Sequence, residues 1–538
     1  MNEWWRGAVI YQIYPRSFAD SNGDGVGDLP GVIDRLDYIA ALSVDGVWIS
    51  PFFRSPMKDY GYDVSDYRDV DPVFGTLDDF DRLLARAHQL GLKVLIDQVY
   101  SHTSDEHPWF AESRSSSTNP RADWYVWADA KPDGSPPNNW QAVFGGAAWE
   151  WDLSRRQYYL HNFLTEQPDL NFHSPAVQEE ILDTARFWLD RGVDGFRLDV
   201  ANFYAHDPQL RDNPPRASGR PALRPYMFQE HLYDRSRPET LEFIGRLRAL
   251  SDTYPDRMLL GEIECEDPLG RQLEYVRGPD ALHTAYSFFL LRAPQATAET
   301  FRQALAGWTE AEGWPSWSLG NHDVPRFPTR LAGDDPPRTK LLLALLVMLR
   351  GTSFIYQGDE LGLPQAQVPR DRLRDPDAIR NHLAGSGRDG ARTPMPWTAD
   401  SPGAGFTIAS DAWLPLDPRH LDMSVERQAQ EAQSVLAFTR RLLAFRRDHP
   451  VFRTGALRFT DASAGCLAFE RVGKGERIVC VFNLGDEACV FGPAQAIDFD
   501  LGAIVEHGEA VLPPWTGLVV QLDANLSEGA RALRGDPA

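Results

Sequence analysis

Isolated acidic residues end short apolar runs at four widely separated places in the chain. One such acid alone is most often a helix cap or the partner of a nearby arginine. Four ionised acids brought together would repel one another. Such a cluster therefore indicates a site in which one carboxyl group is an ionised nucleophile and another stays protonated and acts as an acid. Cleavage of a glycosidic bond needs such a pair. The four runs are Val94-Leu95-Ile96-Asp97, Gly195-Phe196-Arg197-Leu198-Asp199, Leu259-Leu260-Gly261-Glu262 and Leu319-Gly320-Asn321-His322-Asp323.

The elements that must position these acids are predicted by an alternation of short apolar strands with amphipathic helices. This alternation is typical of parallel strands joined by crossover helices, and eight such strands close a barrel. Barrel enzymes carry their chemistry at the carboxyl ends of the strands, which is where the four acids fall. The predicted strands span residues 8–14, 47–50, 93–99, 195–200, 258–263, 284–288, 316–320 and 353–357.

Two of the predicted helices show their ends in the sequence. Thr76 and Asp79 form a start that resembles a capping box, and Gly91 stops that helix. Ser174-Pro175 opens a second helix. Their apolar faces consist of Phe80, Leu83, Leu84 and Ala87 in the first helix, and of Val177, Ile181, Ala185 and Leu189 in the second.

Three inserts interrupt the alternation of strands and helices, and from about residue 454 alternating β-strand patterns replace it. The predicted fold class is α/β: a (β/α)8 TIM barrel with a loop-rich subdomain after the third strand and a C-terminal antiparallel β domain. A second insert, rich in Pro and Arg, follows Val200. The predicted units are the barrel at 1–100 and 172–453, with an insert at about 363–420, the subdomain at 101–171, the β domain at 454–525 and a polar tail at 526–538.

The charge balance limits the partners that the protein can have. Among 538 residues, 54 Lys and Arg against 77 Asp and Glu give a net charge of −23. Such a field repels nucleic acid and anionic membrane surfaces. We therefore expect neither a nucleic-acid nor a membrane partner. The expected partners are small molecules, and the expected assembly is a monomer or homodimer.

The chain contains neither a signal-peptide pattern nor an apolar run of 18 or more residues, so we expect a cytoplasmic protein. Its four cysteines show no paired metal-ligand spacing. We expect Cys265, Cys466, Cys480 and Cys489 to be free, buried thiols rather than a disulfide framework.

The motifs around the acids resemble a known enzyme family. Asp97 to His102, Gly195 to Asp199, Gly261-Glu262 and Asn321 to Asp323 look like the four signature regions of glycoside hydrolase family thirteen, the α-amylase superfamily. The resemblance runs in order through nearly the whole chain. The segments 138–146, 167–171 and 388–397 resemble its branch of oligo-1,6-glucosidases and α-glucosidases.

This resemblance implies a retaining mechanism without a catalytic cofactor. It makes Asp199 the nucleophile, Glu262 the general acid/base and Asp323 a third carboxylate that stabilises the distorted transition state. Attack by Asp199 and a second displacement assisted by Glu262 preserve the α configuration. Water as acceptor gives hydrolysis, whereas a sugar or an alcohol gives transfer.

Further residues are expected around the glucose. Arg197 lies two residues before Asp199, on the same face of the strand, and can hold that carboxylate ionised. The resemblance implies that Tyr62 stacks on the sugar ring and that Arg388, with Arg392 as the alternative, closes the subsite. The expected substrate-binding set is Asp59, Tyr62, His102, Arg197, His322 and Arg388.

One loop near the N-terminus offers oxygen atoms on alternate residues, the spacing of a site for Ca²⁺ or Mg²⁺. It is not an EF-hand, because its twelfth position is Gly31 rather than Glu. It resembles the calcium or magnesium loop of oligo-1,6-glucosidases, which implies one structural divalent cation; the alternative is an Asx-turn loop without a cation. The implied ligands are Asp20, Asn22, Asp24, the carbonyl of Val26 and Asp28.

Two cues to the substrate conflict. Val200 directly after the nucleophile is usual among α-1,6-acting members of the branch, whereas the long excursion behind it resembles α-glucosidases that favour disaccharides such as maltose. We expect an α-glucosidase for short α-glucosides, maltose first, that also transfers glucose. The alternatives are an oligo-1,6-glucosidase, a sucrose- or trehalose-acting relative, a trehalose-6-phosphate hydrolase and a non-catalytic scaffold.

Overall fold

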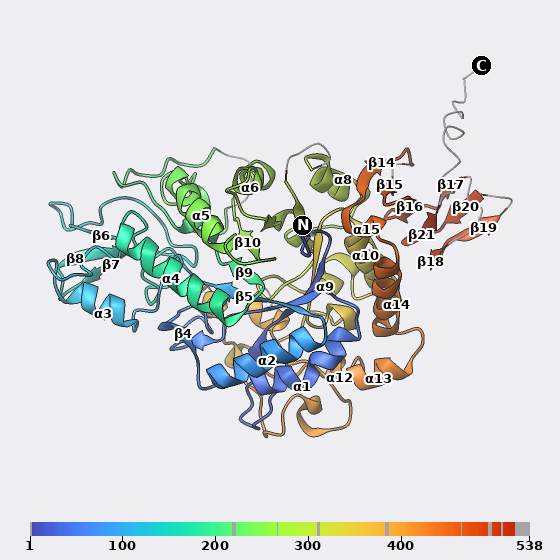
Figure 1. Cartoon of the computed structure of the whole chain (residues 1–538), viewed down its shortest axis with the longest axis horizontal. Coiled ribbons are helices and arrows are strands. Elements are labelled where there is room, and N and C mark those ends of the chain that lie inside the picture. The colour runs from blue at the N-terminus through green and yellow to red at the C-terminus, as the bar shows by residue number, and fades with distance from the viewer. Residues whose placement is uncertain are drawn as a thin grey trace, which may run out of the picture.

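A closed barrel of eight parallel strands occupies the centre of the molecule (Figure 1). The strands follow one another around the barrel in chain order, and the last pairs with the first, Val9 beside Ser353. All eight predicted barrel strands are confirmed. They are β1 (Val9–Ile13), β2 (Gly46–Ile49), β5 (Lys93–Gln98), β9 (Gly195–Leu198), β10 (Met258–Glu262), β11 (Thr284–Tyr286), β12 (Pro315–Ser318) and β13 (Thr352–Tyr356).

This architecture comes from a computed structural model, which describes residues 3–217, 222–265, 267–308, 313–381, 387–463, 465–492, 498–506 and 509–521. The predicted polar tail at 526–538 lies outside these residues. Within them, no helix is long and apolar enough to cross a membrane.

Alternate residues of the barrel strands belong to two separate apolar clusters. Ile10, Trp48, Leu95, Leu260 and Phe354 belong to one cluster, which fills the barrel interior. The residues between them pack with the helices in a second, larger cluster. The strands are therefore buried on both faces, which explains why they read as nearly continuous apolar runs.

The helices cover the barrel (Figure 1). In α2, Thr76 and Asp79 form the predicted capping box, and all four predicted apolar residues are buried. In α4, Pro175 is the first residue and the predicted apolar face is buried. The helices of the barrel and its inserts are α1 (Leu29–Ala40), α2 (Leu77–Gln89), α4 (Pro175–Arg191), α5 (Pro238–Ser251), α6 (Pro268–Val276), α7 (Phe288–Leu291), α8 (Ala298–Ala306), α9 (Phe327–Ala332), α10 (Pro336–Met348), α11 (Pro376–Asn381), α12 (Pro418–Leu421), α13 (Val425–Gln430), α14 (Val435–Asp448) and α15 (Val451–Thr454).

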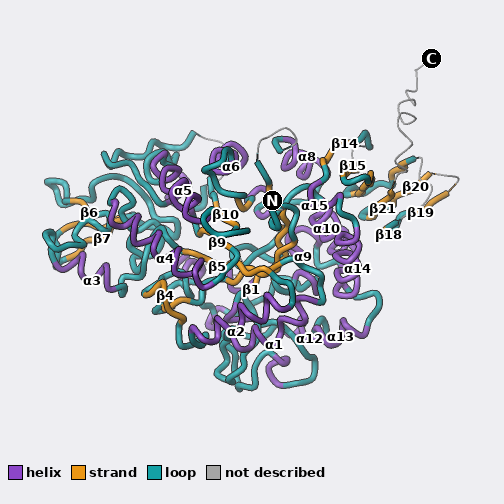
Figure 2. The backbone as a smooth tube through the Cα atoms, viewed as in Figure 1, coloured by secondary structure: helices purple, strands orange, loops and turns teal. Residues whose placement is uncertain are grey.

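The segment between β5 and α4 consists mostly of loop, as Figure 2 shows. It contains α3 (Pro108–Ser115) and a small antiparallel sheet in the order β6 (Trp127–Ala128), β8 (Gln157–Leu160), β7 (Trp149–Asp152). A short hairpin, β3 (Phe53–Arg54) with β4 (Asp66–Val70), precedes it. The inserts after β9 and after β13 are loops with short helical turns, and all three inserts supply side chains to the cavity described below.

Two antiparallel sheets form the C-terminal part. The central strand β16 is buried on both faces, because Ile478 and Cys480 pack on the barrel helices while Val479 and Val481 face the smaller sheet. The larger sheet has the order β14 (Ala456–Phe459), β15 (Cys466–Gly473), β16 (Glu476–Asn483), β21 (Thr516–Gln521), β18 (Phe499–Leu501), and the smaller one β17 (Cys489–Phe491), β20 (Glu509–Leu512), β19 (Ile504–Glu506).

The expectation of four free thiols was wrong for one pair. Cys466 and Cys489 form a disulfide, whereas Cys265 and Cys480 remain outside any disulfide; Cys480 is buried as expected, but Cys265 is only half-buried. The bonded residues begin strands in different sheets, and both belong to the apolar cluster between those sheets. Their separation of 23 residues along the chain could not show that contact.

Candidate active site

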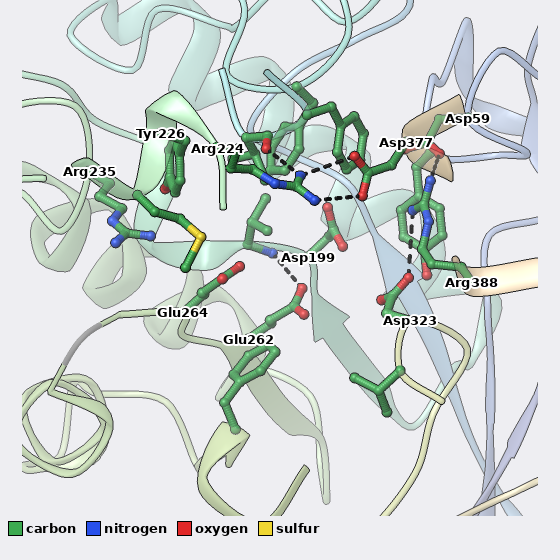
Figure 3. A pocket seen from close by; sticks show the side chains of 18 of the residues that line it. Asp59, Asp199, Arg224, Tyr226, Arg235, Glu262, Glu264, Asp323, Asp377 and Arg388 are labelled. Carbon is green, nitrogen blue, oxygen red and sulfur yellow. Dashed lines mark hydrogen bonds and ion pairs between the residues drawn. The ribbon is translucent and has the colours of Figure 1, made fainter. Parts of the chain in front are cut away.

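A cavity of about 470 Å³ opens at the carboxyl ends of the barrel strands (Figure 3). Three of the four acids noted in the sequence line it: Asp199 directly after β9, Glu262 at the end of β10 and Asp323 beyond β12. Asp97 is fully buried and does not line it. The barrel therefore gathers three of the four predicted carboxyl groups at the cavity, whereas the fourth, Asp97, lies buried outside its lining.

One buried guanidinium group, that of Arg197, forms hydrogen bonds with three of the acids. Arg197, completely buried, donates through Nη1 to Asp97 Oδ1 at 2.8 Å and to Asp199 Oδ1 at 2.6 Å, and through Nη2 to Glu262 Oε2 at 2.5 Å. Its spacing before Asp199 predicted one of these contacts, but not the other two. Because Arg197 holds one oxygen of both Asp199 and Glu262, it fixes the orientation of both carboxyl groups.

The backbone of Val200 holds the same oxygen of Glu262. Its N–H donates to Glu262 Oε2 at 3.0 Å. Val200 also adopts a left-handed conformation, with φ 34° and ψ 50°, which is rare for a β-branched residue and costs free energy. Since Oε2 accepts two N–H groups, the carboxyl proton belongs on Oε1.

The three acids that line the cavity have different pKa values because their surroundings differ. Burial raises the pKa of Glu262 to about 8; Arg197 opposes this rise, and the negative charge of Asp199 adds to it. Burial likewise raises the pKa of Asp199 to about 7 against the opposing charge of Arg197. Burial alone would raise the pKa of Asp323 too, but His322, Arg392 and Arg388 hold it well below its usual value. Glu262 is thus the group best suited to donate a proton.

A second set of polar groups lines one side of the cavity. Arg388 Nη2 donates to Asp59 Oδ1 at 2.7 Å and to Asp375 Oδ1 at 2.9 Å. Tyr62 and His102 line the same cavity, and burial lowers the pKa of His102 to about 4, so this imidazole is neutral. Arg388 lines the cavity whereas Arg392 is fully buried behind Asp323 and donates to its Oδ1 at 2.8 Å. The geometry thus favours Arg388 over Arg392 as the residue that closes the subsite.

His322 lies behind the cavity wall. It is fully buried, with Nε2 at 2.6 Å from the Tyr62 hydroxyl and Nδ1 at 2.7 Å from Gln12 Nε2, and its ring stacks on Tyr62. Burial lowers the pKa of His322 to about 3. Its expected role in substrate binding therefore stays a prediction, while its contact with Tyr62 positions a residue that does line the cavity.

Several lining residues were missed by the sequence analysis. Gln167 stands in the segment 167–171, which was noted there without a role, and its Nε2 lies 3.1 Å from His102 Nε2 and 3.4 Å from Asp59 Oδ2. Phe144 likewise stands in the noted segment 138–146. Most of the others come from the inserts or from the segments after the strands, and no local pattern marked them. Among these others are Phe163, Arg224, Tyr226, Arg235, Glu264, Arg292, Asp375 and Asp377.

The predicted cation loop is bent by its own hydrogen bonds. Asp20 Oδ1 accepts from the N–H groups of Asn22 at 3.0 Å and Gly23 at 2.7 Å, and Asp24 Oδ1 accepts from that of Val26 at 2.8 Å. An ionised carboxylate keeps further lone pairs, so these bonds do not prevent coordination. Among the described residues, no three His, Cys, Asp or Glu side chains are grouped to hold a metal ion. The loop's other oxygen donors, an amide and a carbonyl, are of the kind that Ca²⁺ and Mg²⁺ accept, and the site stays a prediction.

A (β/α)8 barrel that holds an ionisable and a protonated carboxyl group at its strand ends has the pair of acids that glycoside hydrolases require. The comparison with known families agrees with this class, since the catalytic domain of α-amylase matches residues 12–455. The chain belongs to the α-amylase family, glycoside hydrolase family thirteen, and it is an enzyme of the α-glucosidase type.

Its similarity to individual proteins extends over almost its full length. The chain is 50% identical to a probable α-glucosidase of Rhizobium meliloti, over 97% of both chains. It is 35% identical to an oligo-1,6-glucosidase of Parageobacillus thermoglucosidasius, over 96% of this chain and 99% of the relative. The crystal structure of an α-glucosyl transfer enzyme superposes with a TM-score of 0.92 at 50% identity, over 97% of this chain and 100% of the other.

Proposed function

We propose that the protein is a retaining α-glucosidase that removes terminal α-linked glucose from short α-glucosides, maltose first, and also transfers that glucose to sugar or alcohol acceptors. The observation that carries this proposal is the sharing of Arg197 between Asp199 Oδ1 and Glu262 Oε2. It leaves one oxygen of each carboxyl group for the reaction.

The mechanism follows from these atoms. Asp199 Oδ2 attacks the anomeric carbon while Glu262 Oε1 gives its proton to the leaving oxygen, which forms a β-linked glucosyl ester and releases the aglycone. Glu262 Oε1 then takes a proton from water or another hydroxyl group, whose oxygen attacks the same carbon and frees Asp199. Ionised Asp323, held by Arg392, stabilises positive charge on the sugar ring in both steps.

The preference for short substrates rests on the cavity. Its volume of about 470 Å³ is that of a small-ligand pocket. Arg224, from the insert after β9, binds Asp377 of α11 through two hydrogen bonds of 3.0 and 3.2 Å. The same guanidinium donates to the Val143 carbonyl at 2.9 Å, so three inserts meet at this wall and limit the room for longer chains.

A second candidate is an oligo-1,6-glucosidase. Val200 lines the cavity directly beside the nucleophile, and the residue at this position bears on linkage in the branch. The relative from Parageobacillus thermoglucosidasius carries that name. The catalytic residues are the same in both candidates, so only the choice of substrate separates them.

Proton NMR of the purified protein with maltose tests the proposal. We expect α-glucose in the first minutes and new glucosides at high maltose concentration. Isomaltose, measured in parallel, decides between the two candidates by the ratio of kcat/KM values. If β-glucose appeared first, the double-displacement mechanism would be wrong. If the protein turned over neither maltose nor isomaltose, both candidates would be refuted.

The pH dependence of kcat/KM should be bell-shaped, with both limbs above the range of ordinary carboxylic acids. Activity needs Asp199 ionised, so it rises as pH passes the pKa of about 7, and it needs Glu262 protonated, so it falls as pH passes about 8. A profile from pH 4 to 10 with p-nitrophenyl α-glucoside checks both limbs. An optimum near pH 4.5 would contradict the burial effect on this pair.

We also propose that Asp20, Asn22, Asp24, the Val26 carbonyl and Asp28 hold one Ca²⁺ or Mg²⁺ as a structural ion. None of these residues lines the cavity. Chelation by EDTA should therefore lower the melting temperature by a few degrees, with recovery when either cation is added back, because the ion binds only the folded state. Asp24→Ala should abolish the recovery and leave kcat within about twofold of the wild type. An EDTA-independent melting temperature would favour the Asx-turn loop without a cation.

A further inference from the structure

One loop carries two of the residues that line the cavity. The segment 55–63, which lies between β3 and β4, brings Asp59 and Tyr62 to the side on which glucose is expected to bind. Its backbone is left-handed at Met57, with φ 63°, and at Tyr60, with φ 52°. This conformation costs free energy in residues other than glycine. Contacts made by other groups must therefore hold the loop in its shape.

The carboxyl group of Asp63 closes this loop on itself. Its Oδ1 accepts from the N–H of Asp59 and from the Ser55 hydroxyl, both at 2.9 Å, and its Oδ2 accepts from the N–H of Lys58 at 2.8 Å. Burial raises the pKa of Asp63 to about 6, whereas these two N–H groups oppose the rise, so the group is an ionised acceptor at neutral pH. Successive N–H groups that converge on an anion form a nest, and here a side chain of the same loop fills it. Asp63 is completely buried and does not line the cavity, so its role is not direct contact with the substrate.

The hydrogen bond to Asp63 fixes Asp59 from the backbone side. The Asp59 carbonyl in turn accepts from the N–H of Tyr62 at 3.2 Å. The Asp59 side chain pairs with Arg388 at 2.7 Å, on the side of the cavity where glucose is expected (Figure 3). Because Tyr62 directly precedes Asp63, a shift of the Asp63 carboxyl group would move both residues that the loop presents to the cavity.

Another part of the loop is held by packing. Arg16 is buried, its Nη2 lies 2.9 Å from Met57 Sδ, and its guanidinium carbon is 5.3 Å from the ring centre of Tyr60. Two further aromatic rings lie at the same distance from this cation. Loss of the Asp63 carboxylate should therefore release Asp59 without unfolding the loop.

We propose that Asp63 is a positioning residue for glucose: its carboxylate holds the backbone N–H of Asp59, so that Asp59 and Tyr62 keep the geometry that binds the reacting sugar. This inference rests on the proposed function and adds to it a residue outside the cavity. The glucose unit is common to every α-glucoside. Loss of the carboxylate should therefore weaken the binding of all of them by the same factor, whatever the leaving group.

The test measures how tightly the glucose site binds a ligand that has no leaving group. The probe is 1-deoxynojirimycin, a ring with the hydroxyl pattern of glucose, and isothermal titration calorimetry gives its dissociation constant without any turnover. In Asp63→Asn, an amide of the same shape replaces one acceptor oxygen by a donor, so that constant should rise roughly 10- to 100-fold, as expected for lost hydrogen bonds to a charged group. The values of kcat/KM for maltose and for p-nitrophenyl α-glucoside should both fall, and their ratio should stay as in the wild type.

Two further variants separate positioning from stability. Ser55→Ala removes a neutral donor to the same carboxylate from a half-buried serine, so it should fold and raise the dissociation constant roughly 2- to 10-fold. Asp417→Asn is the matched control, because Asp417 is also buried, accepts from the backbone N–H groups of Arg419 at 2.9 Å and Gln367 at 3.3 Å, and lies outside the cavity lining. It should keep the wild-type dissociation constant even if its melting temperature falls.

The inference is overturned if folded Asp63→Asn binds the probe as tightly as the wild type, or if Asp63→Asn does not fold and Ser55→Ala binds the probe as tightly as the wild type. A changed ratio of the two kcat/KM values in Asp63→Asn would also contradict it, because the defect would then extend to the leaving group. Wild-type protein that neither binds the probe nor turns over either substrate would instead refute the proposed function, and this inference with it.

Discussion

Azide should restore turnover to both Asp199→Gly and Glu262→Ala, with opposite stereochemistry. Without the nucleophile we expect kcat for an activated α-glucoside to fall at least roughly 10⁴-fold, since no glucosyl ester can form. In the Asp199→Gly variant, azide fits the space left by the carboxylate and attacks directly, so the product is the β-glucosyl azide. In Glu262→Ala the ester still forms, and azide then displaces Asp199 to give the α-glucosyl azide.

The leaving group supplies an internal control for this experiment. Glu262→Ala should lose roughly 10²- to 10⁴-fold with maltose, whose leaving oxygen needs a proton, and much less with p-nitrophenyl α-glucoside. Melting temperatures near that of the wild type would show that both variants fold. The product configuration is read by proton NMR. If Asp199→Gly gave the α product, the assignment of the two carboxyl groups would be reversed.

The sequence predicted the scaffold and the reacting groups because both depend on local patterns. Buried parallel strands are apolar on both faces, so all eight were visible as short runs. Three of the four acids that end these runs line the cavity at the mouth of the barrel, and the fourth, Asp97, is buried. Asp199, Glu262 and Asp323 could therefore be placed together before any coordinates were known.

The arrangement of the remaining groups depends on contacts between segments far apart in the chain, which no local pattern shows. Arg224 reaches Asp377 across 153 residues, and Arg388 reaches Asp59 across 329. The same limit applies to the disulfide between Cys466 and Cys489, and to His322, which the motif marked but which lies behind the wall. The inserts shape the part of the cavity that selects the substrate, so linkage preference is the property that the sequence predicts least well.

Replacement of Arg197 should strongly lower both the stability of the fold and the catalytic activity. The guanidinium is completely buried and is the shared partner of Asp97, Asp199 and Glu262. In Arg197→Met these acids lose their cation, and at neutral pH the free energy of unfolding should fall by about 3 to 5 kcal/mol. Their pKa values should rise further, so Asp199 becomes protonated at neutral pH and kcat falls roughly 10³-fold or more.

The sign of the pH dependence separates this electrostatic cause from a loss of packing. With the cation gone, the folded state binds more protons than the unfolded state over a wider range, so the stability of Arg197→Met declines as pH rises. Its deficit relative to the wild type, measured by urea unfolding, should grow between pH 5.5 and pH 7.5. Arg471→Met is the matched control, because Arg471 is also fully buried but binds backbone carbonyls, such as that of Met348 at 2.7 Å. The control's deficit should be the same at both pH values. An equal deficit at both pH values in Arg197→Met would mean that this residue fills space and leaves the charge of the nucleophile to be held by other groups.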